Sequence, residues 1–270
     1  MKKLSIEEVQ AMLLDLMKIV HRFAEENEIK YYLLGGSALG AVRHEGFIPW
    51  DDDIDIGMVR SEYERFLSIA ERFDSKYEVI NYRNAKNCDF GLTRIYIPNT
   101  YVDNLSVAKT KLDKRLYFDV FPLDNVPDDM RDLKKFEKQI LRKKKMISRI
   151  DARDYQTSKS KLLLKQIVAM ILRPFRQNIL RSFDKSMQKY SDHSTSRICS
   201  LCSQYSFKKQ VMEKSVYGVP TLHKFEDTEL YIPENVVAYL TTLFGGDYMM
   251  MPPEEKRRKG YDIYLTNEEE

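Results

Sequence analysis

The sequence predicts an α+β fold in which a mixed β-sheet is flanked by helices and carries a helical extension. Short strand patterns alternate with helical patterns over the first 130 residues, and a basic stretch with helical periodicity follows them. With 270 residues, of which 43% are hydrophobic, the chain can build a sizeable core. We expect a core unit over residues 1–130, a basic helical extension over 131–212, and a C-terminal segment over 213–270 that packs back on the core.

The N-terminal segment predicts a long amphipathic helix. Ser5 and Glu8 have the spacing of a capping box, in which each side chain binds a backbone amide of the other residue. Apolar residues then recur at helical spacing along one face: Val9, Met12, Leu13, Leu16, Val20 and Phe23. The start is charged rather than continuously apolar, which is not typical of a secretion signal. We therefore expect a cytoplasmic protein.

A glycine turn comes next and predicts an anion-binding helix start. Residues 31–34 are typical of a short buried strand, and Gly35, Gly36 and Ser37 then open a short helix. Backbone amides at a helix start favour an anion. The two glycines would let a phosphate approach the main chain closely, and the Ser37 hydroxyl can donate a hydrogen bond. Gly35, Gly36 and Ser37 are thus candidate substrate ligands.

The most acidic segment, residues 50–56, predicts a metal site. In an extended strand, Asp51, Asp53 and Asp55 share one face, while Asp52 points to the other face. Carboxylates about 6.5 Å apart repel each other by roughly 2.5 kcal/mol at an effective dielectric near 20. A hard divalent cation, Mg²⁺ above all, would relieve this repulsion. The alternatives are a solvated acidic turn and a calcium loop, but the segment lacks the glycine and glutamate of an EF-hand.

Two basic residues lie between the glycine turn and the acidic run. The Arg43 guanidinium is a candidate ligand of phosphate oxygens. A surface salt bridge to Glu45 is the alternative. His44 is a candidate acid or base, or alternatively a residue that only forms hydrogen bonds.

Further along the chain we expect a helix over residues 61–73 that covers the sheet. Strands are predicted over 77–82, 90–97 and 101–105, and they extend the sheet toward Asp119. Asp119 stands among apolar and aromatic residues over 116–124, so its carboxylate would be buried and costly unless a shared cation compensates it. The alternative is a structural carboxylate that caps the next loop. A strand over 217–222 and a helix over 233–244 complete the prediction.

Charge and cysteine content narrow the function. The net charge of +3 gives no reason to expect a nucleic-acid partner. The apolar run within the basic segment over 131–176 is too short to span a bilayer. The segment is either a solvated helical face or a surface that contacts anionic lipid at the inner membrane face. Three cysteines, Cys88, Cys199 and Cys202, fit reduced thiols, since no second pair stands at zinc spacing.

Three motifs together resemble the LicD family of phosphotransferases, relatives of fukutin and fukutin-related protein within the nucleotidyltransferase superfamily. The first is LLGGSALGAVRHEGFIPWDDDIDIGMVRSEYERF, the second is LYFDVFPLD around Asp119, and the third combines FGGDYM with PPEEKR near the C-terminus. They bracket roughly residues 30 to 260. The resemblance implies that residues 1–130 form a nucleotidyltransferase-like catalytic core.

The resemblance also implies an activity. Asp53, Asp55 and Asp119 match the aspartates that hold catalytic metals in such proteins, and Asp51 is a further candidate ligand. One or two Mg²⁺ ions, or Mn²⁺, would support transfer of phosphocholine from CDP-choline to a sugar of a teichoic acid or lipopolysaccharide precursor, with CMP leaving. Three alternatives stay open: a nucleotidyltransferase that acts on a small molecule, a glycosyltransferase with an Asp-x-Asp motif, and a non-catalytic nucleotide-binding protein.

Overall fold

The computed structural model describes residues 1–88, 90–103, 114–151, 159–257 and 260–266. Its helices are α1 Ile6–Glu26, α2 Gly35–His44, α3 Arg60–Ser68, α4 Met130–Asp151, α5 Lys159–Leu172, α6 Arg176–Met187, α7 Phe207–Gln210, α8 Lys214–Tyr217 and α9 Val236–Phe244. Its strands are β1 Lys2–Lys3, β2 Tyr32–Leu33, β3 Asp55–Val59, β4 Glu78–Ile80, β5 Thr93–Tyr96, β6 Thr100–Asp103, β7 Tyr117–Val126, β8 Arg197–Cys199, β9 Val211–Glu213, β10 Thr221–Phe225, β11 Thr228–Ile232 and β12 Asp262–Leu265. These elements confirm the predicted α+β class.

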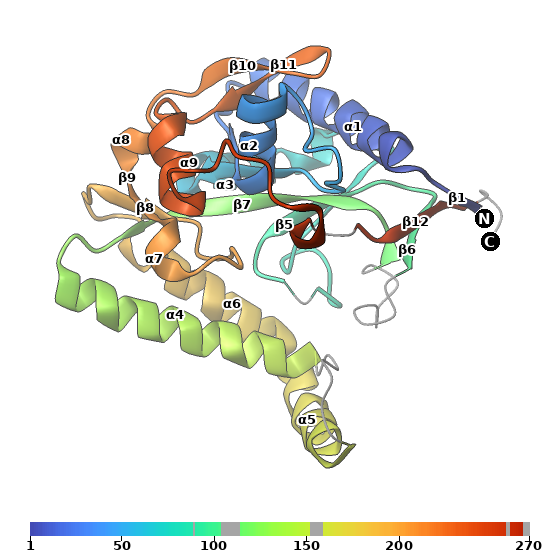
Figure 1. Ribbon diagram of the computed structural model, residues 1–270. Helices are drawn as coiled ribbons and strands as arrows, with labels where there is room; N and C mark the ends of the chain where they lie inside the picture. The colour runs from blue at the N-terminus through green and yellow to red at the C-terminus, as the bar shows by residue number, and fades with distance from the viewer. Residues whose placement is uncertain (89, 104–113, 152–158, 258–259, 267–270) are drawn as a thin grey trace.

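The central sheet has seven strands and is mixed, as expected. Five strands lie in the order β2-β3-β7-β5-β4, and β8 and β9 continue the sheet from the second half of β7. The β3–β7 pair is parallel, and the other pairs are antiparallel. Strand β7 is the longest at ten residues and runs through the middle of the molecule (Figure 1). It therefore links the predicted core to β8, which lies within residues 131–212, and to β9, which lies at the end of that range.

The N-terminal helix forms as the sequence predicts. The Ser5 side chain accepts a hydrogen bond from the Glu8 amide, and the Glu8 carboxylate accepts one from the Ser5 amide. Val9, Leu13 and Leu16 are buried on one side of α1, where they join the main core. Helix α1 therefore covers the sheet through its apolar face.

Strand β6 lies in a different sheet from the one expected. It pairs with β12 from the C-terminal end of the chain, and β12 also pairs with β1 from the N-terminal end. The prediction that residues 101–105 extend the sheet toward Asp119 was therefore wrong. The pairing partners are more than 150 residues from β6 in the sequence, so local alternation could not identify them.

The prediction of a strand over residues 217–222 was wrong in position. Tyr217 ends the short helix α8, and Gly218 follows with a positive φ of 51°. The strand β10 begins only at Thr221 and forms a hairpin with β11 through Glu226, whose φ is also positive at 56°. Because Glu226 is not a glycine or an asparagine, the turn carries no usual hairpin signal.

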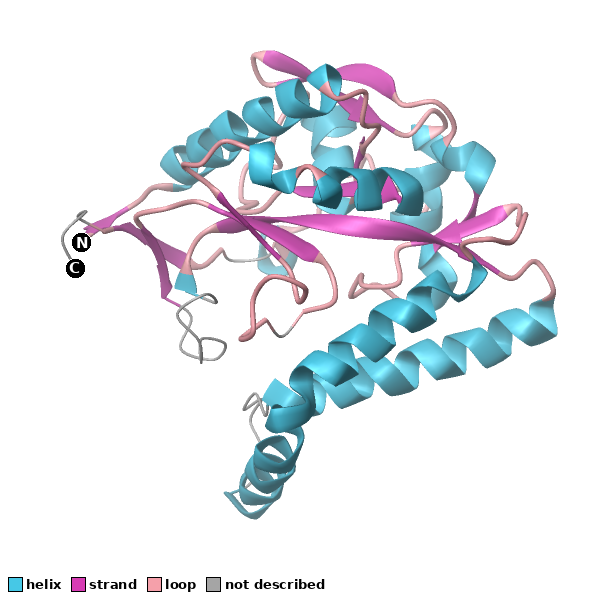
Figure 2. Ribbon diagram, turned by 180° about the vertical axis from the view of Figure 1, so that it is seen from behind, coloured by secondary structure: helices cyan, strands magenta, loops and turns pink. Residues whose placement is uncertain are grey.

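The basic extension projects from the sheet as a helical arm. Helices α4 and α6 pack side by side, and α5 lies at the end farthest from the sheet in both orientations (Figures 1 and 2). A second apolar core forms between α4, α6 and the end of β7: Val126, Leu133, Phe136, Ile140, Phe183, Met187, Cys199 and Leu201. The three cysteines are free thiols, as expected. Among the described residues, none of the helices combines the length and apolar character that a bilayer crossing requires.

Candidate functional site

Two aspartates stand side by side at the start of two neighbouring strands. Asp55 of β3 and Asp119 of β7 are partners in the parallel pairing of these strands. Neighbouring strands lie about 4.8 Å apart, and paired residues send their side chains to the same face of the sheet. The fold therefore brings together two residues that the sequence separates by 64 positions, as the metal-site hypothesis requires.

The start of helix α2 lies against these carboxylates. Gly35 has a φ of +50°, and its amide donates a hydrogen bond to the Tyr239 hydroxyl at 2.9 Å. A Cβ on Gly36 would lie 2.7 Å from Asp51 Oδ2, and one on Gly35 would lie 3.7 Å from Asp55 Oδ2. Gly36 is needed because the Asp51 carboxylate occupies the space that a Cβ would fill, whereas Gly35 is favoured by its positive φ. The positive end of the helix dipole also favours these charges.

Ser37 has a role that the sequence did not indicate. Its hydroxyl accepts a hydrogen bond from the Asp55 amide at 2.9 Å, and its side chain is buried. The hydroxyl therefore fixes the first residue of β3 against the first turn of α2. Its own O–H remains a donor, so binding of a phosphate by Ser37 stays a prediction.

The acidic run is a loop before β3 rather than part of the strand. The strand begins at Asp55, so the expected alternation over residues 51–54 was wrong. Within the described part of the chain, the three carboxylates with oxygens all within 4.8 Å of one another are those of Asp51, Asp52 and Asp53. The carboxylate of Asp52 therefore lies close to those of its two neighbours instead of pointing away from them.

Two contacts hold this loop in place. The Gln10 side-chain amide of α1 donates to the carbonyl oxygens of Ile48 and Asp51 at 3.2 and 2.9 Å. The Asp52 carboxylate is only 6% exposed and accepts a hydrogen bond from the Tyr261 amide at 2.8 Å. The loop is thus fixed by the first helix and by the C-terminal segment, which supports a role as a preorganised ligand set.

Asp119 has a cationic partner that sequence reasoning missed. Arg94 of β5 donates from Nε to Asp119 Oδ1 at 2.9 Å, and the two side chains are 15% and 18% exposed. The Arg94 guanidinium lies over the rings of Phe90 and Tyr117, at 4.2 and 3.9 Å from their centroids. Burial raises the pKa of the Asp119 carboxyl, and Arg94 opposes this shift without reversing it.

The donor set fits a hard divalent cation. Carboxylate oxygens are the ligands that Mg²⁺ and Mn²⁺ prefer. The raised pKa of Asp119 means that one guanidinium does not compensate the buried charge completely. Among the described residues, however, no group of three carboxylates within 4.8 Å includes Asp55 or Asp119. The predicted set of Asp51, Asp53, Asp55 and Asp119 is therefore gathered on one side of the sheet without closing around a single point.

Arg43 and His44 contact the C-terminal segment. Arg43 Nη1 donates to the carbonyl oxygens of Tyr248 and Met250 at 2.9 and 3.3 Å, and its Nε donates to His44 Nε2 at 3.0 Å. Burial and the Arg43 charge lower the pKa of His44, which favours the neutral ring that accepts this bond. Glu45, the alternative partner of Arg43, forms its ion pair with Lys224. Phosphate binding by Arg43 and acid–base chemistry by His44 remain predictions.

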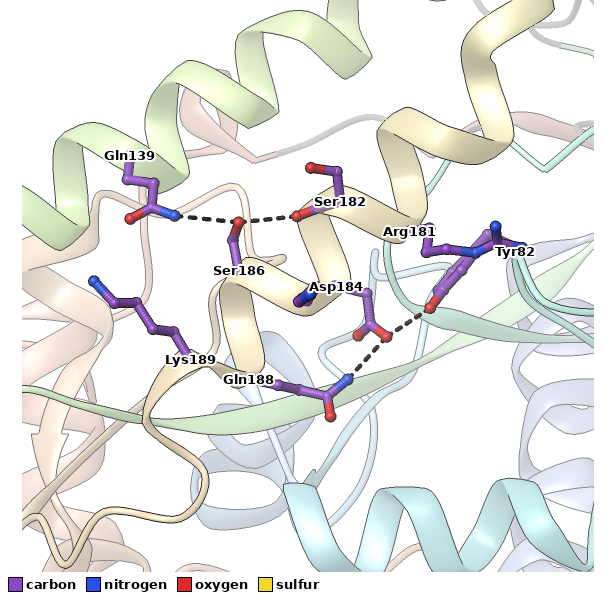
Figure 3. Close-up of a pocket in the computed structure, with 9 residues that line it drawn as sticks. Tyr82, Gln139, Arg181, Ser182, Asp184, Ser186, Gln188 and Lys189 are labelled. Carbon is purple, nitrogen blue, oxygen red and sulfur yellow. Dashed lines mark hydrogen bonds between the residues drawn. The ribbon is translucent and has the colours of Figure 1, made fainter.

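A cavity of about 550 Å³ lies elsewhere, between α4 and α6 (Figure 3). On its wall the Asp184 carboxylate accepts hydrogen bonds from the Tyr82 hydroxyl and the Gln188 amide at 2.6 and 2.9 Å. Asp184 also binds Arg60, which forms a two-pronged ion pair with the fully buried Asp124 of β7. None of the predicted site residues lines this cavity. Its charged groups serve to connect the arm to the sheet.

Comparison with known proteins agrees with the motifs. A family model described as LicD/FKTN/FKRP, nucleotidyltransferase domain, matches residues 28–148. The lipopolysaccharide cholinephosphotransferase LicD of Haemophilus influenzae is 29% identical in an alignment of 266 positions that covers 96% of each chain. An uncharacterized protein of Rickettsia prowazekii is 34% identical over 47% of this chain and 45% of its own. The ribitol 5-phosphate transferase FKRP of Homo sapiens is 57% identical over 30 residues, or 11% of this chain and 6% of that protein.

Proposed function

Because the chain belongs to the LicD/FKTN/FKRP nucleotidyltransferase family, we propose that it transfers phosphocholine, or a similar phospho-substituent, from a CDP-activated donor to a sugar of a cell-surface glycoconjugate precursor. The acceptor class that we propose is a lipopolysaccharide or teichoic acid precursor. The observation that carries the proposal is the group of carboxylates at the start of α2, in a chain that aligns almost end to end with a cholinephosphotransferase.

The site residues would have three different roles: metal binding, phosphate binding and positioning of a metal ligand. Asp51, Asp53, Asp55 and Asp119 would hold one or two Mg²⁺ ions. When bound, Mg²⁺ neutralises charge on the diphosphate and makes the phosphorus more electrophilic. The first amides of α2, at Gly36 and Ser37, lack partners within the helix and would bind phosphate oxygens beside these carboxylates. Arg94 would hold Asp119 in place through its Nε donor.

The reaction that we propose is a single displacement at the phosphorus that carries choline. The oxygen of an acceptor hydroxyl forms the new P–O bond, the bond to the CMP oxygen breaks, and one proton is released. The products are a sugar phosphodiester and CMP. A nucleotidyltransferase reaction on the same donor would instead attach CMP to the acceptor and release phosphocholine.

Incubation of the protein with Mg²⁺, choline-labelled CDP-choline and glycolipid acceptors tests the proposal. We expect the label on the acceptor, an equal amount of CMP, and loss of both products when EDTA removes the metal. Labelled free phosphocholine with a cytidylylated acceptor would indicate the nucleotidyltransferase alternative. If CDP-choline binds but neither product forms with any acceptor, the chain is a nucleotide-binding protein and the proposal is wrong. A parallel reaction with CDP-ribitol tests whether the protein transfers a phospho-substituent other than phosphocholine.

A further inference from the structure

Helix α5 presents a continuous row of large apolar side chains to solvent. Their exposed fractions range from 43% to 66%: Leu163, Leu164, Ile167, Met170 and Ile171. With 3.6 residues per turn, these five positions fall within an arc of about 120° on the helix surface. Ala169, on another side of the helix, is buried. A surface helix normally turns its apolar stripe toward the core, so the orientation of α5 is the reverse of the usual one.

The position of α5 leaves this row open. Its contacts within the described part of the chain are mainly with α4 and with the short helical turn at Arg173–Phe175. Both views place α5 at the tip of the arm, away from the sheet and from the N and C termini (Figures 1 and 2). Phe175, just after α5, extends the apolar surface with 56% exposure. A flat partner could therefore contact the tip without meeting the rest of the molecule first.

The charges around this tip are mainly positive. Residues 159–176 contain five basic residues and no acidic one, although the whole chain carries a net charge of only +3. The last three turns of the neighbouring helix α4 add three exposed basic residues, Arg142, Lys145 and Arg149, and end at one acidic residue, Asp151. An apolar row bordered by positive charge is complementary to a surface that has an anionic outer layer over an apolar interior.

We propose that the tip of the arm docks onto a membrane rich in anionic lipids. The apolar row of α5 enters the boundary between headgroups and acyl chains, and the exposed basic residues Arg142, Lys145, Arg149 and Arg173 bind lipid phosphates. With 14 residues, α5 is about 21 Å long, so it lies in the interface and does not cross the bilayer. A second copy of the chain fits this face less well, because pairing two tips would bring like charges together.

Vesicle binding by the full-length protein tests the proposal. We expect the protein to pellet with vesicles of equal parts phosphatidylglycerol and phosphatidylcholine and to stay in solution with phosphatidylcholine alone. The double variant Ile167→Glu with Ile171→Glu should bind the mixed vesicles about tenfold more weakly. Leu222→Glu makes the same change at a residue that is 49% exposed on the distant hairpin, and it should bind like wild type.

A second pair of variants isolates the charge contribution. Arg149→Gln with Arg173→Gln leaves the apolar row intact and should weaken binding at low salt, with a smaller salt dependence than wild type. Circular dichroism spectra that match wild type show that each variant is folded.

Equal binding of both vesicle types by wild type, or unchanged binding by the Ile167 and Ile171 variant, would overturn the proposal. So would a wild-type dimer that this variant converts to a monomer, since a second copy would then cover the face. The assay measures binding rather than turnover, so its result is independent of the proposed reaction.

Discussion

Asp55 and Asp119 face each other across the parallel pairing of β3 and β7, and the carboxylate of Asp119 is bound to Arg94 on the next strand. This relationship defines the candidate site, because it places Asp55, the first residue of β3, beside Asp119 and its ion pair with Arg94. The site therefore contains an ion pair beside the carboxylates that we propose as metal ligands.

Asp55→Asn should lower the rate of CMP release by about a hundredfold or more, because it removes a charged ligand at the reacting diphosphate. The Asn side chain has nearly the same shape, so the melting temperature without Mg²⁺ should change little. Turnover and thermal melting of the same preparation check both expectations. A variant that keeps more than half of the wild-type rate would remove Asp55 from the mechanism.

Gly36→Ala should reduce activity through the position of Asp51. The added Cβ would lie 2.7 Å from Asp51 Oδ2, so the carboxylate must move. Gly246→Ala is the matched control, since no atom lies within 4 Å of its added Cβ. Steady-state kinetics at several Mg²⁺ concentrations should show a higher Mg²⁺ requirement for Gly36→Ala and wild-type behaviour for Gly246→Ala. Identical Mg²⁺ curves for the two variants would separate Asp51 from the metal site.

Arg60→Met should destabilise the fold by about 3–5 kcal/mol, because it leaves the buried carboxylate of Asp124 without its partner. Lys3→Met removes an exposed pair with Asp262 and should leave the unfolding free energy nearly unchanged. Urea denaturation measures both values. A loss below about 1 kcal/mol for Arg60→Met would mean that the network between arm and sheet contributes little to stability.

The pH dependence of metal stabilisation should follow the raised pKa of Asp119. A raised pKa in the folded state means that the folded protein without metal loses stability as pH rises from 3.8, the unfolded value, through the folded value. Bound Mg²⁺ competes with the proton, so the increase in melting temperature that it causes should grow over the same range. Melting curves with and without Mg²⁺ between pH 4 and pH 8 test this expectation. An increase that shrinks as pH rises would contradict it.

Local sequence patterns were sufficient for the parts of the fold that depend on neighbouring residues. The capping box at Ser5 and Glu8 and the glycine opening of α2 both form as predicted, because their hydrogen bonds join residues a few positions apart. The predicted strand around Asp119 also forms, with its apolar neighbours Phe118 and Val120 buried in the sheet.

The parts that failed depend on distant residues. Strand β6 pairs with β12, and no local signal indicates that partner. Alternation wrongly extended β3 back over Asp51–Asp53, because the contacts that hold this loop come from Gln10 and Tyr261. Arg94 could not be assigned to Asp119 before the antiparallel register of β5 and β7 was known.

The most direct test of the central claim is calorimetric titration of Mg²⁺ into the protein in the presence of CDP-choline. The account predicts saturable binding to wild type and no measurable binding to Asp53→Asn, Asp55→Asn or Asp119→Asn, with each variant still folded by circular dichroism. Wild-type Mg²⁺ affinity in all three variants would show that these aspartates hold no metal, and the account would be wrong.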